Sequence, residues 1–525
     1  MNLATLASAD PPRYRIIVID PPDGVEVDDL PEPYMGINNR GEVVSTVNEE
    51  NATYHPFVWL PARNPNYGSA PGMSPGTHEL PLAPDRSQAV PREINVNGIV
   101  VGRVFTSFGT SAYAWNLTTG TNDFLPTFTG DDMHKEEAYD INDATPPIVI
   151  GNGWVTINPF ITRGFRQEYI YPAPDPYPIA EILEPVLSAH DFGQSNSISD
   201  AGFAVGVSAV QGGTSECGEE QDDFRAGTWS SGASTATNLK SLGTPPVEAI
   251  ARPTGVNNAD PEMIVGVGDD PNDLTLPCRQ RALFWEDATA EPVALPYLTV
   301  NGLPLADAMQ ANAIADPFSD GTIQVVGRSE SADAATLWRR VNNVWEAINL
   351  NEVSLCGGAE WANLKHAFDI NTCGWIAGIG TLTDGSPRAF VLIPANACLG
   401  DITGSEVTYP DGKVNVNDLI GVISKWSTSD CVADISGDSA VNVNDLLAVI
   451  NAWGACACFP AQPSVKTLSQ ELTDAGLTQG DWNEYLDVAI NGTQMEKELY
   501  NCWMQRLLSG CVSCPSCSGR NPFQN

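Results

Sequence analysis

Oxygen-bearing side chains recur at a fixed spacing in one short stretch of the last quarter of the chain. They stand at positions 1, 3, 5, 9 and 12 of a twelve-residue segment, with a backbone carbonyl expected at position 7: Asp434, Ser436, Asp438, Asn442 and Asp445, and Ala440 for the carbonyl. These offsets allow one loop to surround Ca²⁺ with hard oxygen ligands, and the residue at position 9 often acts through a water molecule. The segment therefore predicts a calcium site.

The same order of residues occurs earlier in the chain, once an insertion of six residues after Gly404 is allowed. The predicted ligands of this first loop are Asp401, Thr403, Asp411, the Lys413 carbonyl, Asn415 through water, and Asp418. We expect two calcium ions, and the insertion predicts that the first site is the weaker one. The alternative is that both loops are acidic turns that only cap helices.

An apolar pattern follows each loop at the spacing i, i+3, i+4 and i+7, which is one face of an α-helix. Its members are Leu419, Val422, Ile423 and Trp426 after the first loop, and Leu446, Val449, Ile450 and Trp453 after the second. Each loop thus has an exiting helix and no entering helix. The two faces make only a small core, so folding of this segment is expected to depend on metal binding.

This pair of loops and helices resembles the type I dockerin family from residue 398 to residue 456. The resemblance implies two bound Ca²⁺ ions and docking of the helices onto a cohesin-like module of a scaffolding or cell-surface protein. In that family, loop positions 10 and 11 help to select the partner, and here they are Val416–Asn417 and Val443–Asn444. Identical pairs imply a two-fold-symmetric binding face.

A second pattern fills the earlier part of the chain, where one turn motif occurs seven times. Aligned on one turn position, the copies stand at Asn38, Asn95, Asn142, Ser199, Asn257, Ala315 and Asn371, at steps of 57, 47, 57, 58, 58 and 56 residues. Each copy places an Asn or Asp turn, often with Gly, before a short Val/Ile run, which is typical of a tight β-hairpin. Further strands, several of which end in Trp, bring each repeat to about four strands, the number in a propeller blade.

These copies resemble the HAF-type extracellular repeats over residues 34 to 394, although the third repeat lacks a clear aromatic strand after Trp154. The early strand Arg13–Asp20 has no partner in its own repeat. Because a ring of sheets must protect its edges, we expect this strand to complete the seventh blade and close the ring.

The predicted fold is mainly β: a seven-bladed β-propeller, followed by a small all-α dockerin-like calcium-binding domain and a short helical Cys-rich tail. The expected boundaries are residues 1–12 for a signal-peptide remnant or disordered start, 13–396 for the propeller, 397–458 for the paired calcium loops and 459–525 for the tail. A chain of 525 residues is long enough for these separate cores.

Cysteine usage indicates an oxidising compartment. Eight of the twelve cysteines lie between residues 398 and 517, a density typical of disulfides in an exported chain. Ala7-Ser8-Ala9 is similar to the cleavage end of a secretory signal, so we expect an extracellular or cell-surface protein whose signal peptide is truncated here. Cys217–Cys278 and Cys356–Cys373 are the expected propeller disulfides. The four thiols of the tail are expected to form disulfides too, with a zinc or iron–sulfur site as the alternative.

Charge and composition exclude several classes of function. The formal net charge of −39 gives a surface that repels phosphate backbones and anionic lipid, which argues against nucleic-acid and membrane-surface binding. No run of about 18 apolar residues is present, so no membrane span is expected. The five histidines are not spaced as a metal pair, and no nucleophile motif is present. No catalytic pair can be selected from so many carboxylates, because such a pair is defined by its separation in space.

The leading hypothesis is an exported calcium-binding, non-enzymatic extracellular binding or surface-assembly protein, with the propeller as a binding face and the paired loops as a tether. Glycans are the ligands considered for the propeller, and a cohesin-like or other cell-surface protein is the partner considered for the tether. The first alternative is a secreted glycoside hydrolase or polysaccharide lyase, whose paired carboxylates would stand about 5 to 10 Å apart. The second is a structural component of a surface layer.

Overall fold

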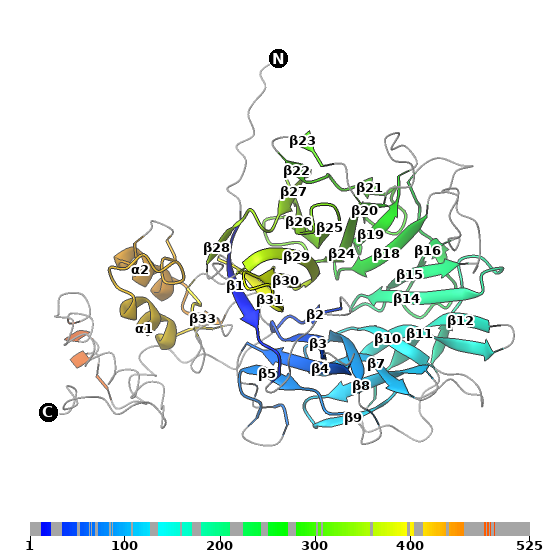
Figure 1. Ribbon diagram of the computed structural model, residues 1–525, viewed down its shortest axis with the longest axis horizontal. Coiled ribbons are helices and arrows are strands. Elements are labelled where there is room, and N and C mark those ends of the chain that lie inside the picture. The colour runs from blue at the N-terminus through cyan, green and yellow to red at the C-terminus, as the bar shows by residue number, and fades with distance from the viewer. Residues whose placement is uncertain are drawn as a thin grey trace, which may run out of the picture. The chain divides into compact units, whose positions relative to one another are not determined.

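The computed structural model describes the following residues (Figure 1): 12–22, 34–49, 53–61, 64, 66–68, 72–82, 86, 88–106, 109–125, 135–157, 160–170, 180–209, 224–242, 250–270, 280–300, 303–305, 308–356, 361–395, 400–403, 413–436, 440–455, 477–478, 480–481, 483–484 and 488. The chain forms two compact units. The first comprises residues 16–60 and 64–393, and the second comprises residues 394–525 together with 12–15 and 61–63.

Seven sheets of four or more strands surround a common axis in the described part of the first unit, which is therefore a seven-bladed β-propeller, as the repeats predict (Figure 1). In blades 1 to 6 the strands are antiparallel neighbours in sequence order, and the first strand is innermost. Blade 1 contains β2 (Gly36–Ile37), β3 (Val43–Glu49), β4 (Thr53–Leu60) and β5 (Gly76–Glu79); blade 2 contains β6 (Ala89–Ile94), β7 (Ile99–Thr106), β8 (Gly109–Asn116) and β9 (Thr121–Phe124); blade 3 contains β10 (Lys135–Ile141), β11 (Ile148–Ile157), β12 (Phe160–Glu168) and β13 (Glu181–Leu183). Blade 4 contains β14 (Phe192–Ile198), β15 (Ala204–Ala209), β16 (Arg225–Trp229) and β17 (Thr237–Asn238); blade 5 contains β18 (Ala251–Val256), β19 (Ile264–Asp269), β20 (Gln280–Trp285) and β21 (Val293–Ala294); blade 6 contains β24 (Met309–Ile314), β25 (Ile323–Ser329), β26 (Ala334–Val341) and β27 (Val344–Asn349). The short pair β22 (Thr299–Val300) and β23 (Leu303–Pro304) lies outside these sheets.

The tryptophans of the third strands link neighbouring blades. Four of these buried indoles donate their ring N–H to a backbone carbonyl that follows the last strand of the preceding blade: Trp115 to Pro81, Trp229 to Glu184, Trp285 to Lys240 and Trp338 to Pro296. A buried indole needs a partner for its N–H, and the repeat supplies that partner at the blade boundary. The Trp at the end of the repeat pattern therefore fixes how consecutive blades pack.

The third repeat forms a complete blade in spite of its irregular sequence. Gln167 in β12 occupies the register position that tryptophan holds in the neighbouring blades, and it is buried. Next to it, the guanidinium of Arg166 donates to the backbone carbonyls of Gly202 and Ser230 in blade 4. A buried arginine thus joins blades 3 and 4 by several hydrogen bonds.

The seventh blade confirms the predicted closure of the ring. It contains β29 (Trp361–Ile370), β30 (Ile376–Leu382) and β31 (Pro387–Pro394), and β1 (Arg13–Ile19) pairs with β31 as its fourth strand. A fifth strand that the sequence did not predict, β28 (Ser354–Cys356), pairs on the other side of β1. Both ends of the propeller sequence therefore contribute to one sheet, which covers the edge that β31 would otherwise expose.

The second unit contains two short helices and one small sheet in its described part. Its elements are β32 (Lys413–Val414), α1 (Val416–Ser424), α2 (Val443–Asn451) and β33 (Gly454–Ala455), with β32 paired to β33 and α1 packed against α2. Each helix begins with a capping box, formed by Asn415 with Asp418 and by Asn442 with Asp445. Neither described helix is long and apolar enough to cross a membrane.

Both helices are shorter than the apolar pattern predicts. They end at Ser424 and Asn451, so Trp426 and Trp453 lie beyond them. After α1 the backbone tightens into hydrogen bonds of the i to i+3 type, and Ser427 adopts a left-handed φ of 62°. Such a residue ends a helix, because the backbone carbonyls of the last turn are then satisfied by the turn instead of by further helix.

One of the expected disulfides is wrong. Cys356 is part of a disulfide, whereas Cys373 is a buried thiol. Cys356 lies in β28 at the outer edge of blade 7, and Cys373 follows β29 at the inner edge. Strand spacing separates them by more than about 14 Å, and a disulfide needs Cα atoms within about 7 Å. Cys431 is also disulfide-bonded.

Several predictions concern parts of the chain outside the described residues. The expected Cys217–Cys278 bridge is one of them, and the four thiols of the tail are another. Of residues 459–525, the structure describes only 477–478, 480–481, 483–484 and 488. The helical Cys-rich tail therefore stays a prediction.

Candidate functional site

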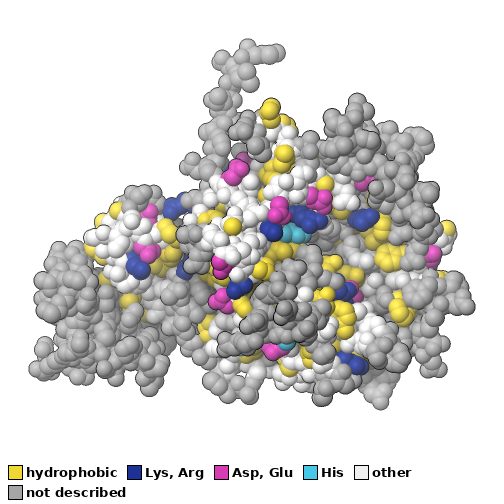
Figure 2. All heavy atoms as spheres, viewed as in Figure 1, with side chains coloured by type: hydrophobic (Ala, Val, Ile, Leu, Met, Phe, Trp, Pro, Cys, Tyr) yellow, Lys and Arg dark blue, Asp and Glu magenta, His cyan; other side chains and the backbone are white. Residues whose placement is uncertain are grey.

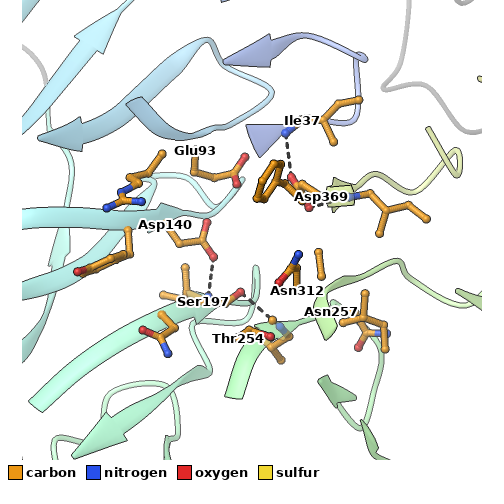
Figure 3. A pocket seen from close by; sticks show the side chains of 18 of the residues that line it. Ile37, Glu93, Asp140, Ser197, Thr254, Asn257, Asn312 and Asp369 are labelled. Atoms are coloured by element: carbon orange, nitrogen blue, oxygen red, sulfur yellow. Dashed lines mark hydrogen bonds between the residues drawn. The ribbon is translucent and has the colours of Figure 1, made fainter. Parts of the chain in front are cut away.

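A cavity of about 680 Å³ occupies the axis of the propeller, and the first strands of all seven blades line it (Figure 3). We call this cavity the central channel. Its turn end is formed by the turns that follow the first strands, and its strand-start end is formed where those strands begin. Figure 2 shows basic, acidic and histidine side chains close together on the propeller face that is in view.

A β-bulge in the first strand of six blades controls which side chains enter the channel. In each case the register shifts at the residue three places before the aligned turn position: Arg92, Tyr139, Asn196, Thr254, Asn312 and Phe368. A regular strand would turn alternate residues away from the axis, whereas a bulge adds one residue and re-aims its side chain. Both the bulged residue and its successor line the channel in every one of these blades.

Asparagines at the aligned turn position form a hydrogen-bonded ring at the turn end, which we call the Asn belt. The side-chain oxygen of Asn95 accepts from the backbone N–H groups of Asn97 and Ile99 in its own turn. The side-chain amides donate to the backbone carbonyl of the same position in the next blade, at 3.0 to 3.2 Å: Asn38 to Asn95, Asn95 to Asn142, Asn142 to Ser199, Asn257 to Ala315, and Asn371 to Asn38. Ser199 and Ala315 have no side-chain amide and therefore interrupt the belt.

Two aspartates tie neighbouring blades together from within the channel (Figure 3). Asp140 accepts a backbone N–H of its own strand at 2.6 Å and that of Ile198 in blade 4 at 2.8 Å. Asp369 accepts a backbone N–H of its own strand and that of Ile37 in blade 1, both at 2.8 Å. Both oxygens of each carboxyl group therefore act as acceptors, and each group spans a boundary between blades.

A third carboxyl group, Glu93, shares this environment. Burial raises the pKa of Asp140 to about 7 and that of Asp369 to about 6. Burial also raises the pKa of Glu93 well above its usual range, and the charges of Asp369 and Asp140 add to that effect. The three groups therefore repel one another when ionised, and protons are bound in the channel near neutral pH.

The chemical use of these groups differs. A carboxyl group that keeps its proton near neutral pH has the property that a general acid needs. Asp140 and Asp369, however, use their oxygens to hold backbone N–H groups of two blades each. Within the described part of the chain, Glu93 accepts one hydrogen bond, from the neighbouring backbone N–H of Ile94 at 2.9 Å. Asp140 and Asp369 therefore serve mainly to connect blades. Among the described contacts, Glu93 has one carboxyl oxygen that accepts no hydrogen bond.

Sequence reasoning missed these three acids, although the repeats contain their signal. The triplet acid-Ile-Asn occurs at Glu93–Asn95, Asp140–Asn142 and Asp369–Asn371, and places the acid two residues before the aligned turn position each time. The repeat alignment therefore predicts that the three acids occupy equivalent places in three blades. What it lacks is the bulge that turns this position into the channel.

The strand-start end of the channel combines aromatic, amide and guanidinium groups, and we call it the strand-start mouth. Its members are Phe192, Gln194, Phe224, Arg252, Gln310, Arg328 and His366. The Arg252 guanidinium lies 3.9 Å from the centre of the Phe224 ring, and Phe192 meets Phe224 edge to face at 6.3 Å. Burial and the charge of Arg328 lower the pKa of His366 to about 3, so this imidazole is neutral.

In the second unit, the structure brings the first and last predicted ligands of each loop close together. Asp401, Asp418, Asp434 and Asp445 are all buried. One oxygen of Asp418 accepts the backbone N–H groups of Ile402 and Thr403, at 2.8 and 2.9 Å, and one oxygen of Asp445 accepts that of Ser436 at 2.8 Å. The residue at position 12 is thus folded back over positions 1 to 3 in both loops.

The remaining predicted ligands are distributed differently. Asn415 and Asn442 are N-caps, and their side-chain oxygens accept the backbone N–H groups of Asn417 and Asn444 at 2.8 Å. The structure describes the two residues whose backbone carbonyls are predicted ligands, Lys413 and Ala440. It also describes Thr403 and Ser436. Asp411 and Asp438 lie outside the described residues. Among the described residues, no group of three or more His, Cys, Asp and Glu side chains is placed to hold a metal ion.

No protein-family model and no curated protein matches the chain. Several solved structures are similar to this chain at low identity. The β-propeller domain of the Trilobed protease from Pyrococcus furiosus is 9% identical with a TM-score of 0.39, over 68% of this chain and 95% of that domain. AofleA from Arthrobotrys oligospora is 9% identical with a TM-score of 0.33, over 65% and 91%. Pyrococcus horikoshii acylaminoacyl peptidase is 11% identical with a TM-score of 0.36, over 69% of this chain and 52% of that chain, so this chain spans about half of the peptidase. This likeness concerns the fold alone.

Proposed function

We propose that the chain is an exported, calcium-binding, non-enzymatic protein of the extracellular space or cell surface. Its HAF-like propeller serves as a binding face and its dockerin-like second unit as a tether. One observation carries the proposal: in both loops, the carboxylates at positions 1 and 12 are buried. These residues are Asp401 and Asp418 in the first loop, and Asp434 and Asp445 in the second. Two buried carboxylates in one short loop repel each other, and a divalent cation removes that repulsion.

The donor set of both loops fits Ca²⁺. Every predicted ligand is an oxygen of a carboxylate, hydroxyl, carboxamide or backbone carbonyl, which are the hard ligands that Ca²⁺ prefers. Asp418 and Asp445 are held at the start of their own loops by backbone hydrogen bonds, which is the position that a final ligand needs to close the coordination shell. Calcium would supply charge neutralisation here, and Asp411 and Asp438 are the residues expected to complete the two shells.

The tethering role is supported by an exposed apolar stripe on α2. Val443, Leu447 and Ile450 are 50%, 49% and 43% exposed, although the sequence pattern placed Ile450 on the packed face. The equivalent residues of α1 are all buried: Val416, Ile420 and Ile423. Among the described residues, only α2 exposes this stripe, which favours docking on one helix over the expected two-fold-symmetric face. We propose that a cohesin-like or other cell-surface protein docks on the α2 stripe.

The channel favours binding over catalysis. A hydrolase of the glycosidase type needs two carboxyl groups that are available to substrate or water, whereas Asp140 and Asp369 use both oxygens within the fold. The rival function, a secreted glycoside hydrolase or polysaccharide lyase, is favoured by the raised pKa of Glu93, which suits a general acid. A structural surface-layer role would need the tether but no ligand in the channel.

An incubation experiment separates these functions. The full chain, with Ca²⁺ present, is incubated with a panel of polysaccharides, and both retention on the polysaccharide and release of reducing ends are measured. The proposal predicts retention without product. Product formation that is lost in Glu93→Gln but kept in Glu79→Gln, a carboxylate on the outer strand β5, would establish the hydrolase instead. If the chain is not retained and no product forms, the structural surface-layer role is the one that remains.

A further inference from the structure

We infer that the strand-start mouth is a binding site for a neutral saccharide. This inference rests on the proposed binding function of the propeller and adds the residues and the class of ligand. The mouth belongs to the same cavity of about 680 Å³ as the channel, which is large enough for a few sugar rings. Its members come from blades 4 to 7, so a ligand there would contact several blades at once.

The polar groups of the mouth suit a ligand that is rich in hydroxyl groups. A carboxamide offers one acceptor and two donors, and a guanidinium offers donors in a fixed plane, so both can pair with two adjacent hydroxyl groups. Gln194, Gln280 and Gln310 all line the cavity. Within the described part of the chain, neither Gln280 nor Gln310 makes a side-chain hydrogen bond, which leaves both amides available to a ligand.

The aromatic groups of the mouth supply the apolar surface that a sugar ring also needs. Phe224 makes two contacts: the Arg252 guanidinium lies 3.9 Å from its ring centre, and the Phe192 ring meets it edge to face with ring centres 6.3 Å apart. This stack restricts both the ring and the guanidinium before a ligand arrives, so less conformational entropy is lost on binding. The apolar C–H face of a sugar ring can then lie on the aromatic surface, while the hydroxyl groups of the sugar reach the glutamine amides.

The charges around the mouth select against an ionic ligand. Each arginine has an acidic neighbour: the charge of Arg252 acts on Asp269, and Arg328 contacts Glu330 at 3.0 Å. Deeper in the same cavity lie the carboxyl groups of Glu93, Asp140 and Asp369, which offer an anion no positive charge. His366 is neutral, and its Nε2 accepts a hydrogen bond from the Asn312 side-chain amide at 2.6 Å. A ligand with dipoles but no net charge meets no uncompensated repulsion here.

The test compares neutral and acidic oligosaccharides of equal length with the full chain by titration calorimetry in the presence of Ca²⁺. Neutral oligosaccharides of glucose, mannose, galactose and xylose are the probes, and oligogalacturonate is the acidic comparison. We expect a neutral probe to bind, and Phe224→Ala and Gln310→Ala each to weaken it by about tenfold, as expected for the loss of one stacking or bidentate contact. Gln310 is half-buried, so we expect its variant to retain the fold.

The matched control is Tyr297→Ala. Tyr297 carries a similar stack, with the Arg281 guanidinium 4.0 Å from its ring, but it does not line the cavity. Binding that is unaffected by Phe224→Ala and Gln310→Ala, or equally weakened by Tyr297→Ala, would overturn the site. Preference for oligogalacturonate would overturn the ligand class. If no saccharide binds while Ca²⁺ still stabilises the second unit, the inference fails but the tether of the proposed function survives.

Discussion

At the scale of single residues, the asparagine at the aligned turn position of five repeats has two separate roles. Its side-chain oxygen holds its own turn, and its amide nitrogen reaches the carbonyl of the next blade. Neither Asp nor Ser can fill both roles, because Asp has no donor and Ser is too short to span the blade boundary. Five of the seven aligned positions are Asn, and these five build the Asn belt.

Removing one link of the belt should destabilise the propeller. Asn95→Ser takes away the donor to the Asn142 carbonyl, which is buried, so we expect a loss of about 1 to 3 kcal/mol in the free energy of unfolding. Denaturant unfolding of the full chain measures this loss. The control is Asn97→Ser, at an exposed position of the same turn. Equal losses for both variants would contradict a role for the belt.

The channel acids should make stability depend on pH. The pKa of Asp140 is raised from 3.8 to about 7 in the folded state, so the folded state binds this proton more tightly than the unfolded state. The resulting contribution to stability is complete below about pH 4 and is lost as the pH rises to about 7. Asp140→Asn cannot titrate. The free energy of unfolding of the wild type, relative to that of Asp140→Asn, should therefore decrease as the pH rises from about 4 to about 7. Denaturant titrations measure it, and the same pH dependence in both proteins would contradict the raised pKa of Asp140.

At the scale of elements, sequence pattern predicts strands and turns but not their finer geometry. The steps of 56 to 58 residues, with one of 47, predict the blades because every repeat has the same turn chemistry. The bulges could not be predicted, since one extra residue in a strand leaves the alternation of a short apolar run ambiguous. The predicted helix ends were wrong because Trp426 and Trp453 fit the helical spacing of apolar residues, although the helices end at Ser424 and Asn451.

The strand β1 is the element whose removal should have the largest effect on the ring. Tyr14, Ile16 and Ile19 are buried, and β1 lies between β31 and β28 in the sheet of blade 7. Deleting residues 1–20 exposes the edge of β31, so we expect a lower melting temperature and concentration-dependent association. Size-exclusion chromatography and thermal unfolding measure both effects. A deletion of residues 1–11 alone should behave as the full chain does, and an identical loss in both deletions would contradict closure by β1.

At the scale of the whole molecule, the parts differ in how far sequence can specify their function. The paired loops of the second unit are local in sequence, so their proposed calcium ligands could be chosen from spacing alone. The channel is built from residues of all seven blades, such as Glu93 and Asp369, whose proximity follows only from the closed ring. The strand-start mouth is equally non-local. The sequence therefore predicts the fold and the calcium loops, while the channel and its mouth require the structure.

The central claim is that the second unit binds two Ca²⁺ ions and is stabilised by them. Losing Asp445, the final residue of the uninterrupted loop, should reduce calcium affinity more than losing Asp401, whose loop contains the insertion. Binding to the folded state alone raises stability with ligand concentration, so the unfolding transition of this unit should move to higher temperature with Ca²⁺. The propeller transition provides an internal reference within the same chain.

The most direct test is calorimetric titration of the chelator-treated full chain with Ca²⁺, together with circular dichroism before and after. The account predicts binding of two Ca²⁺ ions per chain with a gain of helical signal, and binding of only one ion to Asp445→Asn. Absence of calcium heat, with spectra that are the same with and without chelator, would show that Asp418 and Asp445 only cap their helices. The calcium-dependent tether would then be contradicted.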